Sequence, residues 1–241
     1  MIGVLARALD RPLRPLGLRL LPSWRVQWWS AAERFTRRGK EYACFYHAFN
    51  CGWPPYTSER SVELALANAW LEDFRPDEVI EIGAVTPYYW PHRVTSVVDP
   101  FDEHTLVSHR QSLFELTLDR PVLSISTFEH IGKGDYGSTE PDESSTLAFQ
   151  KVFTESPAFL ITVPVGYNLR VDDWLFGSEL PEDVTRDFIV RDGESRWRLA
   201  RDNADARRPY GDPIVQAQFP GTSIGVWANS VAVLERTSRA R

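Results

Sequence analysis

The segment VIEIGAVTPYYW, residues 79–90, carries the clearest strand signal in this sequence. Two apolar residues lead into an acid, a single glycine follows, and Pro87 and an aromatic cluster come next. A short, β-branched segment of this kind is typical of a strand that is buried on both faces of a parallel sheet. The residues at its end are therefore expected at the edge where such sheets bind ligands.

Three further segments share this strand pattern. The four predicted strands cover residues 78–84, 94–99, 121–127 and 158–164. Near the end of the chain, DFIVRDGESRWRLA predicts a hairpin around Asp192-Gly193, and residues 226–236 predict a last strand.

Helical patterns alternate with these strands. Apolar residues recur at helical spacing after a Thr57 or Ser58 cap, which predicts a helix that ends before Arg75. A second helix is predicted from Thr139 through about Thr154, as a crossover between the third and fourth strands. Together the elements predict an α/β protein with a mostly parallel sheet.

The composition is that of a globular chain with one core. The chain has 241 residues, of which 43% are hydrophobic and 25% charged. Its two cysteines, Cys44 and Cys51, are too few for a disulfide framework, and no signal sequence is evident, so a cytoplasmic protein is expected. His47 lies between them, but the spacing lacks a fourth zinc ligand and predicts no metal site.

The first 40 residues differ in charge from the rest of the chain. Residues 1–40 carry nine basic side chains against two acidic ones, in a protein whose net charge is -6. With Trp24, Trp28 and Trp29, they resemble a basic amphipathic arm that contacts the inner face of a membrane peripherally. The alternative is an arm that packs on its own domain, residues 41–241, or on a second subunit in a homodimer.

Polar residues stand where the predicted strands end. Glu81 and Gly83 close the first strand, Asp99 closes the second, and residues 126–130, STFEH, follow the third. A glycine permits close approach of a ligand to the backbone, and an acid at the second strand end suits a ribose diol. The pattern predicts a nucleoside-binding site.

These residues resemble a known family. EIGAVTPYYW, SVVDP, VLSISTFEHIGKGDYG, FLITVPVGYN and WANSVAVLE, in this order, are similar to class I S-adenosylmethionine-dependent methyltransferases, in particular bacterial members associated with glycan assembly. The resemblance covers about residues 42–236. It implies a Rossmann-like fold with a mostly parallel seven-stranded sheet, an antiparallel last strand and helices on both faces. It also implies S-adenosylmethionine as the cofactor and O-methylation of a saccharide or small-metabolite hydroxyl as the activity.

The resemblance also implies which residues bind the methyl donor. Asp99 would bind the ribose, the neighbourhood of Phe101 would face the adenine, and the end of the third strand would line the methionine side. The implied donor site comprises Glu81, Gly83, Ala84, Asp99, Pro100, Phe101, Ser126 and Thr127.

The catalytic and acceptor residues follow from the chemistry of methyl transfer. An alcohol acceptor benefits from a general base of near-neutral pKa, and His130 is the natural candidate, with Glu129 able to orient it. Aromatic and polar side chains nearby are candidate acceptor contacts, because aromatic faces stack on rings. These candidates are Tyr88, Tyr89, Asp135 and Tyr136.

The first loop departs from the family pattern. The family loop carries three glycines, whereas Ala84-Val85 and Thr86-Pro87 replace the later ones here. An acid at the end of a further strand is also missing, and Glu115 and Asp119 are poor substitutes. A non-catalytic binding or scaffold protein of the same fold is therefore the main alternative.

Two other function classes fit less well. A nicotinamide enzyme needs G-x-G-x-x-G after the first strand, and only Gly83 is present. A nucleic-acid partner is not expected, because the acidic body would repel phosphates.

Overall fold

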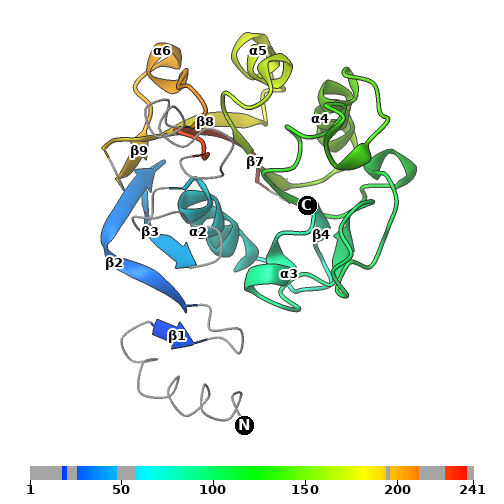
Figure 1. The fold of residues 1–241 in the computed structure, drawn as a ribbon, viewed down its shortest axis with the longest axis horizontal. Helices are drawn as coiled ribbons and strands as arrows, with labels where there is room; N and C mark the ends of the chain where they lie inside the picture. The colour runs from blue at the N-terminus through cyan, green and yellow to red at the C-terminus, as the bar shows by residue number, and fades with distance from the viewer. Residues whose placement is uncertain (1–17, 21–25, 48–57, 194–195, 212–225, 238–241) are drawn as a thin grey trace. The chain divides into compact units, whose positions relative to one another are not determined.

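The computed structural model describes residues 18–20, 26–47, 58–193, 196–211 and 226–237. The chain divides into two compact units, Met1–Leu66 with Ile189–Ser230 and Ala67–Phe188 with Val231–Arg241 (Figure 1). Within the described ranges, no helix is long and apolar enough to cross a membrane.

The first unit contains a three-stranded antiparallel sheet. Its strands are β1 (Leu18–Leu20), β2 (Val26–Arg37) and β3 (Lys40–His47), in that order. Strand β2 has a register shift between Trp29 and Arg34, and the turn to β3 has positive φ at Arg38 and Gly39. The end of the predicted arm, residue 40, thus falls in a hairpin, and β2 pairs with β3 across that boundary.

Part of the predicted arm and one cysteine cannot be placed. Residues 1–17, Trp24 and Cys51 lie outside the described residues. Cys44 is buried in β3, where desolvation, with a smaller contribution from the charge of Glu33, raises the pKa of its thiol to about 12.

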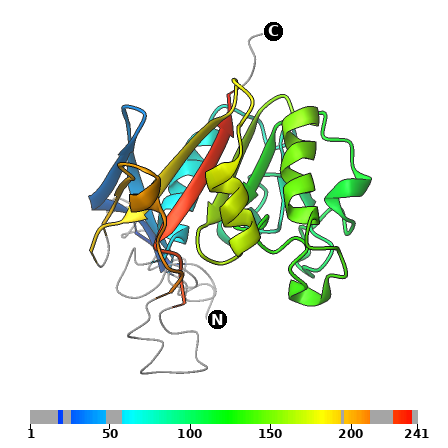
Figure 2. The same ribbon diagram turned by 90° about the horizontal axis from the view of Figure 1, so that it is seen from above.

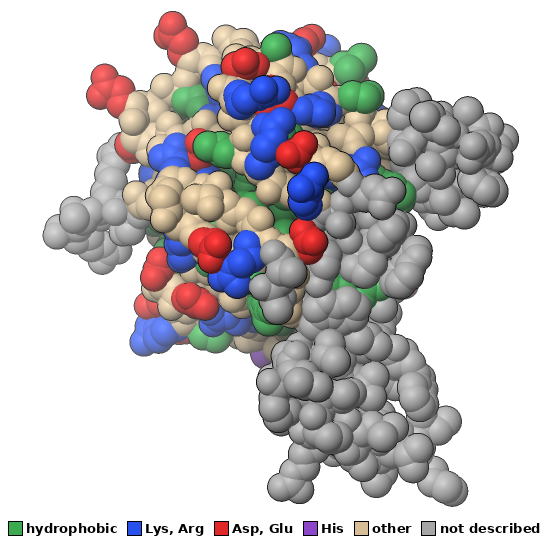
Figure 3. Space-filling model, turned by 90° about the vertical axis from the view of Figure 1, so that its left-hand side faces the viewer, with side chains coloured by type: hydrophobic (Ala, Val, Ile, Leu, Met, Phe, Trp, Pro, Cys, Tyr) green, Lys and Arg blue, Asp and Glu red, His purple; other side chains and the backbone are tan. Residues whose placement is uncertain are grey.

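A second feature of the first unit is an ion-pair cluster on Asp205. Its carboxylate accepts hydrogen bonds from the guanidinium groups of Arg198, Arg201 and Arg208. These bonds, led by those from Arg198, lower the pKa of Asp205. The cluster joins β9 (Trp197–Leu199) to the short helix α6 (Asn203–Ala206). Figure 3 shows one side of the molecule, on which basic and acidic side chains of the described residues are intermixed.

The main sheet has seven strands in the order β5-β4-β6-β7-β10-β8-β9. Strands β4 (Ile80–Ile82), β5 (Ser96–Val98), β6 (Val122–Ile125) and β7 (Phe159–Pro164) are parallel neighbours and are buried at every position. This confirms the four strands predicted from the sequence. A strand that is apolar on both faces is stable inside a parallel sheet, because helices cover both faces of such a sheet.

The last strand, β10 (Ser230–Arg236), pairs antiparallel with β7, as expected. The predicted hairpin is also confirmed, because β8 (Thr185–Arg191) pairs antiparallel with β9, and Gly193 has a φ of +86°.

The edge beside β5 has no further regular strand among the described residues. Only an isolated parallel bridge joins Val98 to His109. The backbone of β5 is nevertheless satisfied, because Val97 N donates to Ser108 Oγ at 2.9 Å and Asp99 N donates to the His109 carbonyl at 3.0 Å. The edge strand on the opposite side of the sheet is β9, which is the seventh strand.

Helices cover both faces of the sheet. Figure 2 shows α4 (Ser144–Glu155) and α5 (Leu169–Gly177) on one face and α2 (Arg60–Leu71) on the other. Ser58 Oγ accepts from Arg60 N at 3.2 Å, as its predicted capping role requires. The second predicted helix begins later than expected, at Ser144 instead of Thr139, because a residue before proline, here Glu140, disfavours helical backbone.

Candidate functional site

The candidate site lies at the carboxyl ends of β4, β5, β6 and β7, within the second unit. The chain leaves β4 for β5 on one side and later returns to β6 on the other side of β4. Such a reversal makes the crevice between β4 and β6 the expected ligand position in an open α/β sheet. The structure therefore brings the predicted strand-end residues to one edge.

Gly83 is in close contact with Thr127 at this crevice. Gly83 has a φ of +86°, and a Cβ added there would lie 2.0 Å from Thr127 Oγ1. The missing side chain therefore makes room for Thr127, a role that the sequence had assigned to an approaching ligand. Thr127 Oγ1 itself donates to the Ile125 carbonyl at 3.1 Å.

Glu81 is fully buried and holds the loop after β4. Its Oε1 accepts from Val85 N at 3.1 Å and from Thr86 N at 2.7 Å, and its Oε2 accepts from the Thr86 hydroxyl. These bonds fix the start of α3 (Thr86–Tyr89), where Pro87 stands in the first turn. Glu81 thus shapes the loop that replaces the glycine-rich one.

Asp99 joins the ends of β4 and β5. Its Oδ2 accepts from Ala84 N at 3.1 Å, and its Oδ1 accepts from Phe101 N and Asp102 N, each at 2.9 Å. A carboxylate has about four acceptor positions, so these three bonds leave room for another donor such as a ribose hydroxyl. Pro100 and Phe101 are exposed beside it, Phe101 by 46%.

The aromatic residues after β4 divide into two environments. The Tyr88 hydroxyl donates to the carboxylate of Asp102, with oxygen distances of 2.9 and 3.0 Å, and its ring contacts His104 edge-on at 4.7 Å. Tyr89 is only 4% exposed and belongs to the core. Of this pair, Tyr88 alone is placed to meet a ligand.

Ser126 ends β6 in an unusual backbone conformation. Its φ is +44°, which a non-glycine residue seldom adopts, and its amide donates to the Thr162 carbonyl at 3.0 Å. Strained residues of this kind cluster at ligand sites. The half-exposed Ser126 therefore remains a candidate for ligand contact.

His130 is the centre of a polar cluster beyond β6. Its Nδ1 lies 2.8 Å from Asp135 Oδ2, and its Nε2 lies 3.6 Å from Glu129 Oε1. Glu129 is 1% exposed, so any effect of its carboxylate on a ligand would have to pass through His130. The structure thus unites both predicted catalytic residues and adds Asp135, which the sequence had assigned to the acceptor.

Tyr167 completes this cluster from the end of β7. Its hydroxyl donates to Asp135 Oδ2 at 2.9 Å, the oxygen that also faces His130. The next residue, Asn168, donates from Nδ2 to the Glu129 carbonyl at 2.9 Å. These bonds connect the loop after β6 with the loop after β7; Asp135 and Tyr167 are 32 residues apart in the sequence.

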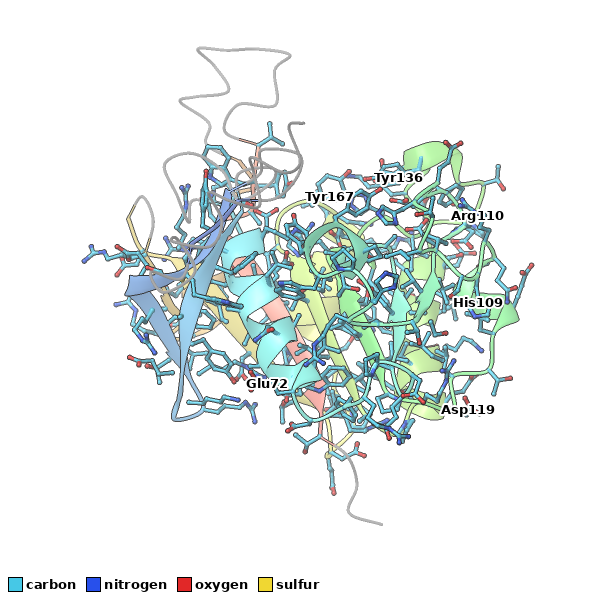
Figure 4. The ribbon with its side chains drawn as sticks, turned by 90° about the horizontal axis from the view of Figure 1, so that it is seen from below. Glu72, His109, Arg110, Asp119, Tyr136 and Tyr167 are labelled. Carbon is cyan, nitrogen blue, oxygen red and sulfur yellow. The ribbon has the colours of Figure 1, made fainter. Side chains whose placement is uncertain are left out.

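Tyr136 and Lys133 flank the cluster. The centroid of the His130 ring lies 5.2 Å from that of Tyr136 and 4.8 Å from that of Tyr167. Each of these rings is tilted by about 60° relative to the His130 ring. Lys133 Nζ lies 3.3 Å from the centroid of the Tyr167 ring. Figure 4 shows Tyr136 and Tyr167 at the same end of the sheet, and Asp119 at the opposite end. Asp119 is therefore not part of the site.

These contacts shift two pKa values. Desolvation raises the pKa of Asp135, but the hydrogen bonds from His130 and Tyr167 and nearby positive charge outweigh it, so the net pKa is lowered. Burial, followed by the hydrogen bond to Asp135, raises the pKa of the Tyr167 hydroxyl. At neutral pH the pair is therefore a carboxylate that accepts and a phenol that donates.

Tyr167, Asn168 and Lys133 were missed by the sequence analysis. Tyr167 follows the fourth predicted strand, so the rule that selected Asp99 and Ser126 would have found it if applied to every strand end. Among the residues that the structure describes, no group of three or more His, Cys, Asp or Glu side chains is arranged to hold a metal ion.

Comparison of the chain with protein-family models, with curated proteins and with solved structures found no match.

Proposed function

We propose that this protein is an S-adenosylmethionine-dependent methyltransferase that methylates a hydroxyl group of a saccharide or another small metabolite. The observation that carries the proposal is the hydrogen bond from Ala84 N to Asp99 Oδ2 at the end of β4, where the chain connections change from one side of β4 to the other. It places a half-exposed carboxylate beside the loop after β4, next to an exposed aromatic ring. The antiparallel β10 agrees with the sheet that the family resemblance implies.

The residues fit the nucleoside half of the donor. Asp99 has acceptor capacity for a ribose hydroxyl, and Phe101 offers a ring face for the adenine. Ser126 and Thr127 are the candidates for the methionine half. When bound, the cofactor supplies an electrophilic methyl group on a sulfonium sulfur.

The protein's own part in the reaction is to align the acceptor and to remove its proton. His130 would accept the hydroxyl proton at Nε2, while Asp135 holds Nδ1 and stabilises the charge that forms on the ring. Glu129, near Nε2, and Tyr167, on Asp135, act as positioning residues. Base catalysis of this kind contributes roughly 10²–10⁴-fold.

Titration of the donor tests the proposal. We expect the native protein to bind S-adenosylmethionine or S-adenosylhomocysteine in a calorimeter, and Asp99→Ala to bind at least tenfold more weakly, or about 1.4 kcal/mol. Asp119→Ala is the matched control, because the Asp119 side chain is 76% exposed at the other end of the sheet (Figure 4). Circular dichroism checks that both variants remain folded.

A non-catalytic binding or scaffold protein of the same fold is the second candidate. It is favoured by the contact of Thr127 with Gly83 and by the engagement of Glu81 with its own loop. If neither the donor nor its product produces heat or a thermal shift with the native protein, this second function replaces the first.

A further inference from the structure

Two exposed apolar side chains directly follow residues of the His130 cluster: Tyr136 follows Asp135, and Leu169, the first residue of α5, follows Asn168. Leu169 is 74% exposed and Tyr136 is 71% exposed, the highest values among the large hydrophobic residues of the described chain. Isolated surface leucines are ordinary, but two such residues beside a polar cluster are a candidate ligand contact. We call the pair the apolar rim.

The backbone that precedes each residue of the apolar rim is held in place by hydrogen bonds. The loop of Tyr136 is fixed by the bonds of Asp135 to His130 and Tyr167, and Asn168, which precedes Leu169, is bonded to the Glu129 carbonyl. Lys133 Nζ also donates to the Tyr167 carbonyl at 3.0 Å. These bonds fix Asp135 and Asn168, the residues that precede Tyr136 and Leu169 in the chain, beside His130 and Glu129.

Tyr136 has a backbone that explains its exposure. Its φ is +55°, and it lies between Gly134 and Gly137, which also have positive φ. A bulky side chain in this region of φ is strained, and such strain marks ligand-binding segments. The Tyr136 side chain is 71% exposed, and its ring centroid lies 5.2 Å from that of the His130 ring.

The apolar character of the rim favours an acceptor with an apolar face. A saccharide carries a hydroxyl on most of its carbons, and each buried hydroxyl needs a hydrogen-bond partner. Leu169 provides no such partner. An aromatic ring instead covers apolar surface and contacts the Tyr136 and Tyr167 rings favourably.

The chemistry of the base favours the same acceptor. An imidazole has an ordinary pKa of roughly 6.5 and a phenol one of roughly 10, whereas the value for water, which resembles an aliphatic alcohol, is about 15.7. Proton transfer from a phenol to a histidine is therefore far less unfavourable than transfer from a sugar hydroxyl.

We propose that the apolar rim of Tyr136 and Leu169 binds the acceptor and that this acceptor is a phenol. The inference rests on the proposed methyl transfer. The phenol gives its proton to His130 Nε2, and its oxygen forms the bond to the methyl carbon. The carbon–sulfur bond breaks, its electron pair stays on sulfur, and the products are an aryl methyl ether and a neutral thioether.

Binding measurements on the full chain test this rim without requiring turnover. Saturation-transfer NMR would compare 4-methylphenol with methyl β-glucoside, in the presence of S-adenosylhomocysteine. We expect 4-methylphenol to bind more tightly, and Tyr136→Ser and Leu169→Ser each to weaken it at least fivefold. Leu147→Ser is the matched control, because Leu147 is a 47% exposed leucine in α4. The expected product of a parallel assay with the donor is 4-methylanisole.

The outcomes separate this inference from the proposed function. Donor binding without phenol binding, tighter binding of the glucoside, or an equal loss in Leu147→Ser overturns the phenol rim alone. Phenol binding that depends on Tyr136 and Leu169, without donor binding, supports the rim as a binding surface and overturns methyl transfer.

Discussion

Replacing Gly83 by alanine tests how the crevice between β4 and β6 is packed. The new Cβ would lie 2.0 Å from Thr127 Oγ1 and 2.9 Å from Thr127 Cβ and Cγ2, at a φ of +86°. Positive φ costs a residue with a Cβ roughly 1–2 kcal/mol, and overpacking costs about 1–3 kcal/mol. We expect Gly83→Ala to lower the free energy of unfolding by roughly 2–5 kcal/mol.

Two further variants separate the two contributions. Gly134 has a φ of +79° and nothing within 4 Å of its built Cβ, so Gly134→Ala reports the backbone cost alone. Thr127→Gly removes all three atoms that clash, so in that background Gly83→Ala should cost only the roughly 1–2 kcal/mol of the backbone. The difference, about 1–3 kcal/mol, is a coupling energy of a double-mutant cycle.

Urea unfolding followed by circular dichroism measures these free energies. A clash between Gly83→Ala and Thr127 is excluded if Gly83→Ala costs no more than Gly134→Ala, or if its cost is the same with and without the Thr127 side chain. Either result would mean that Gly83 faces open space, as a ligand-contacting glycine would.

The remaining predictions concern the base, a buried acid and the arm. His130→Asn should lower methyl transfer by roughly 10² or more while donor affinity stays near native, and an unchanged rate would leave His130 with a packing role only. Burial, followed by the charge of Glu63, raises the pKa of Glu59 from 4.5 to about 7. The protonated Glu59 should therefore contribute its full share to the free energy of unfolding below pH 4.5, and this contribution should fall by on the order of 3 kcal/mol as the pH rises to 7. Glu59→Gln, measured by urea unfolding at pH 5 and pH 8, should remove this loss, and an identical pH profile in the variant would contradict it. The protein should float with anionic liposomes at low salt and less at high salt, and deletion of residues 1–17, which leaves β2 intact, should weaken flotation. Intact protein that stays at the bottom of the gradient at low salt would exclude the membrane contact.

The strands of the central sheet could be predicted from local sequence. Strands β4, β5, β6 and β7 were predicted because a strand buried on both faces must be apolar along its whole length, a property that local sequence carries. The hairpin around Gly193 and the last strand were predicted for a similar reason, since turn residues and β-branched runs are local signals. The same logic placed Asp99 and His130 at the carboxyl edge of the sheet, where open parallel sheets bind ligands.

The contacts of these edge residues depend on which strands are neighbours in the folded chain. Whether Gly83 faces a ligand or Thr127 depends on β4 and β6 being neighbours, and the residues are 44 positions apart in the sequence. Tyr167 meets Asp135 because β7 lies beside β6. Loop conformation and strand order set these distances, and neither leaves a pattern in the residues themselves. Local composition therefore predicts where the strands lie and which residues stand at their ends. The packing of neighbouring strand ends determines which of these residues contact one another in the candidate site.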